Sequence, residues 1–299
     1  YVVYSANYNM STFKFNRLYI IESLQERLTG KELYDDLIKW QEYKYSELQT
    51  NYFPVENKTE LFAIFDRIKK ECQEQGCCPV LHFEMHGDSK FRGLVLNSNE
   101  LVAWEELYII LREINFIVRN NLFLTLAVCH GAYLMQIANI HLPAPFYGFI
   151  GSFDEIYESD LYLRYNEFYA EFFSSFQIHL ALERLHTANP DMPSTYRFIN
   201  SEETFCTVYK NYIKKELSLE GKKRRAKQVI QERKETFMNR TQKRDFEKRF
   251  VKEIEKTKDK YYKEAYYTFF MINEYPENRE RFLIPETFAD FIKSPYFKD

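Results

Sequence analysis

Two apolar runs in the first half of the chain each end in a reactive residue close to a glycine. The first ends at His86, which Gly87 follows, and the second ends at Cys129, two positions before Gly131. Short apolar runs bounded by turn residues predict buried strands. Ligands bind at the carboxyl ends of such strands in an open α/β sheet. We therefore expect His86 and Cys129 at one edge of a sheet.

The rest of the first two thirds alternates between apolar runs and segments with helical spacing of apolar residues. The predicted strands cover residues 17–23, 48–55, 79–86, 122–129 and 146–152, with a hairpin at 92–104. The predicted helices cover residues 31–45, 58–74, 104–120, 131–140 and 161–187. This order predicts an α/β fold with a largely parallel sheet flanked by helices on both faces.

The hydrophobic pattern changes after Pro190: predicted strands are absent there, and the sequence is charged with the periodicity of helices. Residues 218–260 predict one long or bent polar helix, and residues 261–272 are apolar enough to dock on the rest of the protein. The expected organisation is an α/β domain at residues 1–190 and an α-helical C-terminal extension at residues 191–299.

The charge of the chain is unevenly distributed. The whole chain has a net charge of -3, whereas residues 221–260 hold 16 Lys and Arg against 7 Asp and Glu. A basic segment of this kind indicates an intramolecular contact or a separate binding surface. Acidic residues interleave with the basic ones and aromatic residues are few, which favours a solvated helix over nucleic-acid binding.

Composition indicates which broad classes of protein the chain can belong to. The chain is 45% hydrophobic with 8 Gly and 9 Pro, which excludes low-complexity sequence, and its 5 cysteines lack a disulfide framework. Free thiols predict a cytoplasmic location. No apolar run is long enough to span a membrane, and the start lacks the pattern of a signal peptide. Because the chain begins at Tyr1 rather than Met, we expect sequence to precede it.

No metal or cofactor is expected. Cys72, Cys77 and Cys78 cluster in the sequence without the second ligand pair that a zinc site needs, so we interpret them as structural thiols. The chain also lacks a glycine-rich phosphate-binding loop.

A thiol beside an imidazole is the minimum needed for nucleophilic attack on a carbonyl. Cys129 is then the nucleophile and His86 the general acid and base, while the backbone N–H groups of Gly87 and Cys129 form an oxyanion hole. Taken alone, a Cys at the end of an apolar strand, such as Cys129, is more often an inert core thiol than a nucleophile. Asp88 either orients His86 or caps a turn. We expect the His130 side chain to point away from Cys129, and His82 to be buried within its strand.

Three segments resemble the caspase-like superfamily of cysteine peptidases, which includes the bacterial CHAT proteases. They are the His strand at residues 81–87, the nucleophile strand at 127–131, and residues 148–156 with the helix after them. The spacing Cys129-His130-Gly131 is similar to the caspase Cys-x-Gly. The resemblance covers residues 15–190 and implies an endopeptidase with a His86–Cys129 dyad. Likeness to bacterial members implies a regulated effector of antiviral defence or programmed cell death, with a sensor or regulatory partner at the C-terminal helices.

The resemblance also implies that the segment after residues 146–152 shapes the substrate pocket. Carboxylates there, from Asp154, Glu155 and Asp160, would favour Arg or Lys in a protein substrate, although they are also compatible with a solvated loop. Two other functions remain open at this point. One is a catalytically inactive caspase-like binding module, and the other is a nucleic-acid-binding protein that uses the basic helix.

Overall fold

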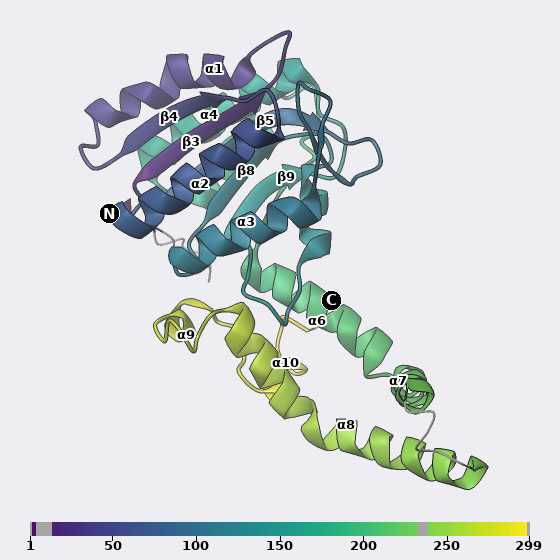
Figure 1. Ribbon diagram of the computed structural model, residues 1–299. Helices are drawn as coiled ribbons and strands as arrows, with labels where there is room; N and C mark the ends of the chain where they lie inside the picture. Colours follow the sequence, from purple (N-terminus) through teal and green to yellow (C-terminus); the bar gives the residue numbers. More distant parts are fainter. Residues whose placement is uncertain (1, 4–13, 233–238, 298–299) are drawn as a thin grey trace. The chain divides into compact units, whose positions relative to one another are not determined.

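The computed structural model describes residues 2–3, 14–232 and 239–297 (Figure 1). Its contacts divide the chain into two compact units. The α/β unit comprises Tyr1–Ala138, Pro143–Ser201 and Phe270–Leu283, and the helical unit comprises Asn139–Leu142, Glu202–Phe269 and Ile284–Asp299.

A mostly parallel sheet forms the centre of the α/β unit. Its strand order is β10-β9-β8-β5-β3-β4, and every neighbouring pair is parallel except β9 and β10. The hairpin β6–β7 pairs antiparallel with the end of β5, and a separate two-stranded sheet joins β1 to β2. The strands are β1 (Val2–Val3), β2 (Lys14–Phe15), β3 (Arg17–Ser23), β4 (Gln49–Pro54), β5 (Pro79–Gly87), β6 (Gly93–Val95), β7 (Leu101–Ala103), β8 (Phe123–Ala127), β9 (Gly148–Ser152) and β10 (Tyr196–Asn200).

Helices cover both faces of this sheet, with α2 and α3 on one face and α1 and α4 on the other (Figure 1). Strand side chains alternate between the two faces. Leu81 and Phe83 therefore join the core beneath α2 and α3, whereas His82 and Glu84 face α1 and α4. The helices of this unit are α1 (Thr29–Leu33), α2 (Lys58–Gln75), α3 (Trp104–Ile117), α4 (Glu158–Ser175), α5 (Ile178–Thr187) and α9 (Asn278–Arg281). The predicted α/β class with a mostly parallel sheet flanked by helices is confirmed.

Local signals set the ends of α2, as predicted. The Asn57 side chain accepts a hydrogen bond from the Glu60 N–H, at 3.0 Å, and so caps the first turn. Gly76 ends the helix in the left-handed conformation, with φ of 65°.

Three predicted helices were wrong in detail. The segment 31–45 forms α1 followed by a π-helical turn at Tyr34–Ile38 and a 3₁₀ turn at Lys39–Tyr43, and Gly131–Ile137 is a 3₁₀ turn. The expected helix 161–187 is two helices, because Phe176 adopts φ of 56° and ends α4. A left-handed phenylalanine is imposed by tertiary packing and has no local sequence signal.

The observed division of the chain differs from the expected boundary at residue 190. The strand β10 lies beyond that boundary and adds an edge to the sheet. The chain also returns to the α/β unit at residues 270–283, where Arg281 donates to the carbonyls of Arg119 and Asn120 at 2.8 and 3.1 Å. A strand this short at an edge has a weak sequence signal, and the return depends on contacts distant in sequence.

The helical unit is held together by aromatic packing. Its helices are α6 (Ser201–Glu216), α7 (Leu219–Glu232), α8 (Arg240–Phe269) and α10 (Phe288–Phe291). Buried rings of Phe205, Tyr209 and Tyr262 contact one another. The expected polar helix 218–260 is divided into α7 and α8, and part of it, 233–238, lies outside the described residues. Within the described ranges, no helix combines the length and apolarity needed to cross a bilayer.

Candidate active site

The pairing of β5 with β8 brings the ends of the two predicted strands together. This parallel register joins residues that are 43 apart in sequence, for example Glu84 with Ala127. His86 and Cys129 have the same separation, two residues beyond that last pair. They therefore lie at the carboxyl edge of adjacent strands, where the sequence predicted them.

His86 and Cys129 line the same cavity of about 370 Å³. Thr29 from α1 and Leu161 from α4 also line it, so the cavity opens on the face of the sheet that these helices cover. The His86 side chain is exposed, and the Cys129 side chain is partly exposed. A volume of this size lies in the range of ligand-binding pockets and can accept a substrate side chain.

Gly87 permits the close approach of the two strand ends. A Cβ atom at this position would lie 1.8 Å from the carbonyl oxygen of Cys129, so only glycine fits without moving the backbone. The Asp88 N–H donates to the carbonyl of Gly93 on β6, at 2.9 Å. Because successive N–H groups of a strand point to opposite edges, the Gly87 N–H is directed away from β6, toward the side of β8 and Cys129.

The Cys129 thiol contacts the backbone of the loop after β9. The Ile156 N–H donates to Sγ at 3.3 Å, and Sγ lies 3.7 Å from the Ile156 carbonyl oxygen, which can accept the thiol proton. An N–H that donates to sulfur stabilises negative charge on it. The sequence contained no signal for Ile156, because a backbone contact places no demand on the side chain.

His130 is engaged elsewhere and does not share the cavity lining. It adopts a left-handed conformation, with φ of 60°, and its Nδ1 lies 2.9 Å from the Phe153 carbonyl. Its ring also contacts that of Phe91, with centroids 4.6 Å apart. His86 is thus the histidine that shares the cavity with Cys129.

Asp88 caps a turn and pairs with Arg92. Its carboxylate accepts hydrogen bonds from the Arg92 guanidinium at 2.8 and 2.9 Å and from the Lys90 N–H at 3.0 Å. The hydrogen bonds from Arg92 hold the pKa of this carboxyl well below its ordinary value. Of the two roles considered for Asp88, the structure supports the turn cap.

The expected acidic residues of the substrate pocket lie elsewhere. Asp160 is buried, where it pairs with Arg164 and accepts a hydrogen bond from Asn189 at 2.7 Å, so its charge is already matched. Asp154 and Glu155 are exposed. Among the described residues, the cavity is lined by neither of these two nor by Asp160. Asp160 lies in the first turn of α4, which begins at Glu158, and this turn directs its carboxylate toward Arg164.

The charged residues that do line the cavity are Glu26, Arg27 and Glu158. Arg27 donates to both carboxylate oxygens of Glu32, with a shortest distance of 2.7 Å, and its Nε lies 3.7 Å from the Glu158 carboxylate. None of these three residues was predicted from the sequence: Glu158 lies between Glu155 and Asp160, and Glu26 and Arg27 precede α1.

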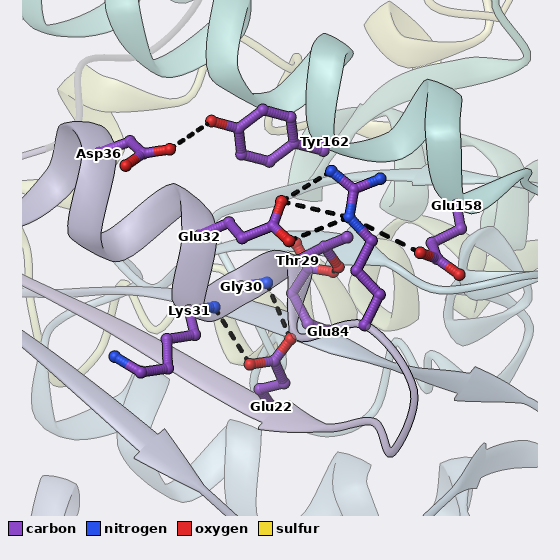
Figure 2. A network of polar contacts seen from close by, with 10 residues as sticks. Glu22, Thr29, Gly30, Lys31, Glu32, Asp36, Glu84, Glu158 and Tyr162 are labelled. Atoms are coloured by element: carbon purple, nitrogen blue, oxygen red, sulfur yellow. Dashed lines mark hydrogen bonds and ion pairs between the residues drawn. The ribbon is translucent and has the colours of Figure 1, made fainter.

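A buried polar network supports the wall of the cavity. Glu84 accepts a hydrogen bond from the Thr29 hydroxyl at 2.7 Å and lies 2.9 Å from His82 Nε2. Its register neighbour Glu22 accepts from the N–H groups of Gly30 and Lys31 at 2.8 and 3.1 Å (Figure 2). These contacts fix the start of α1, and with it Thr29, against the sheet. His82 is buried, as predicted.

The network makes stability depend on pH through Glu22. Burial is the main cause that raises the pKa of this carboxyl from 4.5 to about 7. The folded protein therefore holds a proton that the unfolded chain loses as the pH rises through this interval. We expect the free energy of unfolding to fall by about 3 kcal/mol from pH 4.5 to 7 through this group, and Glu22→Gln to remove that component.

Urea unfolding at a series of pH values measures this slope. Glu26→Gln, which removes an exposed carboxylate from the same segment, should retain the slope of the native protein. An unchanged slope in Glu22→Gln would show that this carboxyl does not titrate in the interval.

Comparison with known proteins adds no assignment. No protein-family model matches the chain, and no curated protein matches it. Across residues 2–3, 14–232 and 239–297, no group of three or more His, Cys, Asp or Glu side chains is placed to hold a metal ion. Cys72 and Cys77 are buried free thiols, and Cys77 Sγ lies 3.5 Å from the Tyr19 hydroxyl.

Proposed function

We propose that the protein is a cysteine endopeptidase in which Cys129 and His86 form the catalytic dyad. The observation that carries the proposal is that both side chains line one cavity at the carboxyl edge of adjacent parallel strands. An inert core thiol would be enclosed by apolar side chains, whereas this thiol is partly exposed in a cavity that the exposed His86 also lines.

The chemistry follows from these two groups. His86 takes the thiol proton, and Sγ of Cys129 attacks the carbonyl carbon of the peptide bond, forming a C–S bond and an oxyanion. Collapse of this intermediate breaks the C–N bond as His86 returns the proton to the leaving amine. Water then attacks the thioester and gives a proton to His86, and the C–S bond breaks to release the carboxylic acid product and restore the thiol.

The N–H groups of Gly87 and Cys129 are the proposed donors to the oxyanion. Alternation along β5 directs the Gly87 N–H toward the side of Cys129, which is the orientation that such a donor needs. The absence of a Gly87 side chain lets the two strand ends approach closely, because a Cβ there would collide with the Cys129 carbonyl oxygen.

The wider proposal rests on the resemblance to caspase-like and CHAT proteases. In this wider proposal, the protein is a regulated effector that cleaves protein substrates in the cytoplasm, in defence or programmed cell death. A regulatory or sensor partner would bind its helical unit. Glu26 and Glu158 replace the acidic residues expected in the substrate pocket, and a cationic substrate side chain would suit their charge.

A covalent trap tests the proposed function. A peptidyl chloromethyl ketone should alkylate Cys129 in preference to the other four cysteines, as located by mass spectrometry, and should stop digestion of casein. Cys78, which is also partly exposed but lies outside this cavity lining, is the internal comparison. Equal alkylation of Cys78 and Cys129, or digestion that continues after Cys129 is blocked, would contradict the assignment.

A further inference from the structure

The helical unit contains a pocket whose lining combines aromatic rings with cations. The pocket has a volume of about 200 Å³, and its lining comes from α6, α7, α8 and the loop Asn139–Leu142. Among the described residues, no Asp or Glu lines it. Its chemistry comes from three tyrosines, two permanent cations and one histidine: Tyr209, Tyr212, Tyr261, Arg225, Lys258 and His141. We call it the tyrosine pocket.

Helical spacing brings the aromatic rings to one place. Tyr209 and Tyr212 are three residues apart on α6, and Lys258 and Tyr261 are three residues apart on α8, so each pair lies on one face of its helix. The rings of Tyr209 and Tyr212 are in contact, with centroids 5.6 Å apart. Tyr209 is buried and Tyr261 is exposed. The pocket therefore extends from an aromatic floor to a rim that is open to solvent.

Arg225 contributes a positive charge that no carboxylate neutralises. One of its terminal nitrogens donates to the Tyr212 hydroxyl at 3.2 Å. In the part of the chain that the structure describes, it forms no ion pair with an Asp or Glu. Its neighbour Arg224 lies 2.6 Å from Glu216 and is paired. The Arg225 guanidinium can therefore bind an anion in the pocket.

Lys258 is only partly neutralised. Its Nζ lies 3.0 Å from Glu255, but the same carboxylate also pairs with Lys222. The next carboxylate along α8, that of Asp259, is directed to α10, where it accepts a hydrogen bond from the Phe288 N–H at 2.9 Å. One carboxylate thus serves two ammonium groups. Together with Arg225, this leaves an excess of positive charge at the tyrosine pocket.

The size and lining of the pocket define the class of ligand that fits. A cavity of about 150 Å³ accommodates benzene, so the 200 Å³ here has room for one six-membered ring with a small substituent. Tyrosine side chains pack well against a flat aromatic ring. Arg and Lys are the side chains that bind phosphate groups. A phosphate carries more negative charge than a carboxylate and suits two cations better.

We propose that the tyrosine pocket binds a phosphate monoester of a single aromatic ring. The ring packs against the tyrosines, and the phosphate oxygens accept hydrogen bonds from Arg225 and Lys258. This chemistry occurs both in phosphotyrosine side chains and in free aryl phosphates. The inference does not depend on the proposed peptidase activity, because the pocket shares no lining residue with the cavity at Cys129 among the residues that the structure describes.

Isothermal titration calorimetry of the full chain with phenyl phosphate, inorganic phosphate, phenol and benzoate measures the contribution of each part of the ligand. Phenyl phosphate should bind about fivefold or more tightly than inorganic phosphate, which lacks the ring. It should bind about tenfold or more tightly than phenol, which lacks the charge. Equal affinity for inorganic phosphate would overturn the aromatic part of the proposal, and equal affinity for benzoate would overturn the phosphate part.

Arg225→Gln should weaken phenyl phosphate binding about tenfold or more, because it removes the unpaired cation. The matched control is Arg224→Gln, which makes the same change at the adjacent residue outside the pocket lining. Its affinity should stay within about twofold of the native chain. Unchanged binding by Arg225→Gln would overturn the proposal, as would an equal loss in both variants, which would indicate net charge alone.

Tyr261→Ala is the second variant, and its exposed position makes a folding defect improbable to interfere. It should weaken phenyl phosphate binding about threefold or more while affinity for inorganic phosphate stays unchanged. A parallel loss for both ligands would contradict the proposed ring contact. Titration with N-acetyl-O-phosphotyrosine amide distinguishes the two sources. Tighter binding than phenyl phosphate identifies a protein side chain as the ligand, weaker binding identifies a free small molecule, and both results support the proposal.

Discussion

Cys129→Ala is expected to lower kcat/KM for proteolysis by at least about 10³-fold, because the variant lacks the atom that forms the acyl intermediate. His86→Ala should lower it by about 10²–10⁴-fold, since proton transfer to and from the substrate is lost. The double variant should be no less active than Cys129→Ala alone, because the two residues act as one unit. Initial rates of peptide cleavage measure all three effects.

The control for this series is Cys78→Ala, which removes a different partly exposed thiol. It should leave kcat/KM within about twofold of the native value. Because Cys129→Ala adds no atom to the tight contact between the Cys129 carbonyl and Gly87, its melting temperature should be close to that of the native protein. Substantial activity remaining in folded Cys129→Ala would exclude the proposed nucleophile.

Asp160→Asn is expected to lower the free energy of unfolding by about 3–5 kcal/mol. The Arg164 side chain is completely buried and forms an ion pair with Asp160. Arg164 also donates to the carbonyls of Leu185 and His186 at 2.8 and 3.2 Å, which ties α4 to the end of α5. Loss of the carboxylate charge would leave a guanidinium in the interior without an anionic partner, and that is costly.

Urea unfolding measures this loss, and Asp191→Asn provides the matched control. Asp191 is exposed in the segment after α5, so removal of its charge should change the free energy of unfolding by no more than about 0.5 kcal/mol. If Asp160 instead shaped a substrate pocket, Asp160→Asn would change substrate preference with little change in stability.

The sequence identified most of the sheet, because the central strands β3, β5, β8 and β9 are almost entirely buried and read as apolar runs. It missed β10 at the sheet edge, where only Tyr196 and Ile199 are buried. It also missed the break at Phe176, which adopts a left-handed conformation that its residue type does not favour. Both features depend on contacts distant in sequence.

The sequence also singled out His86 and Cys129, because each follows an apolar run and precedes a turn. His86 and Cys129 are 43 residues apart, which the sequence shows. Only the pairing of β5 with β8, which joins residues 43 apart, reveals that this separation places them side by side at the sheet edge. The acidic residues expected in the pocket illustrate the opposite case. Asp160 and Glu158 are two residues apart, yet the first turn of α4 buries one in an ion pair and leaves the other at the cavity.

The sequence by itself determined the α/β class, the positions of the central strands along the chain and the two residues at the ends of β5 and β8, because these depend on local hydrophobic patterns. Only the tertiary structure decided which groups surround the thiol and the imidazole. The Ile156 N–H at the sulfur, the Cys129 carbonyl against Gly87, and Arg27 in the cavity wall are all set by loop conformation. Loop conformation follows from packing between segments distant in sequence, on which a local pattern carries no information.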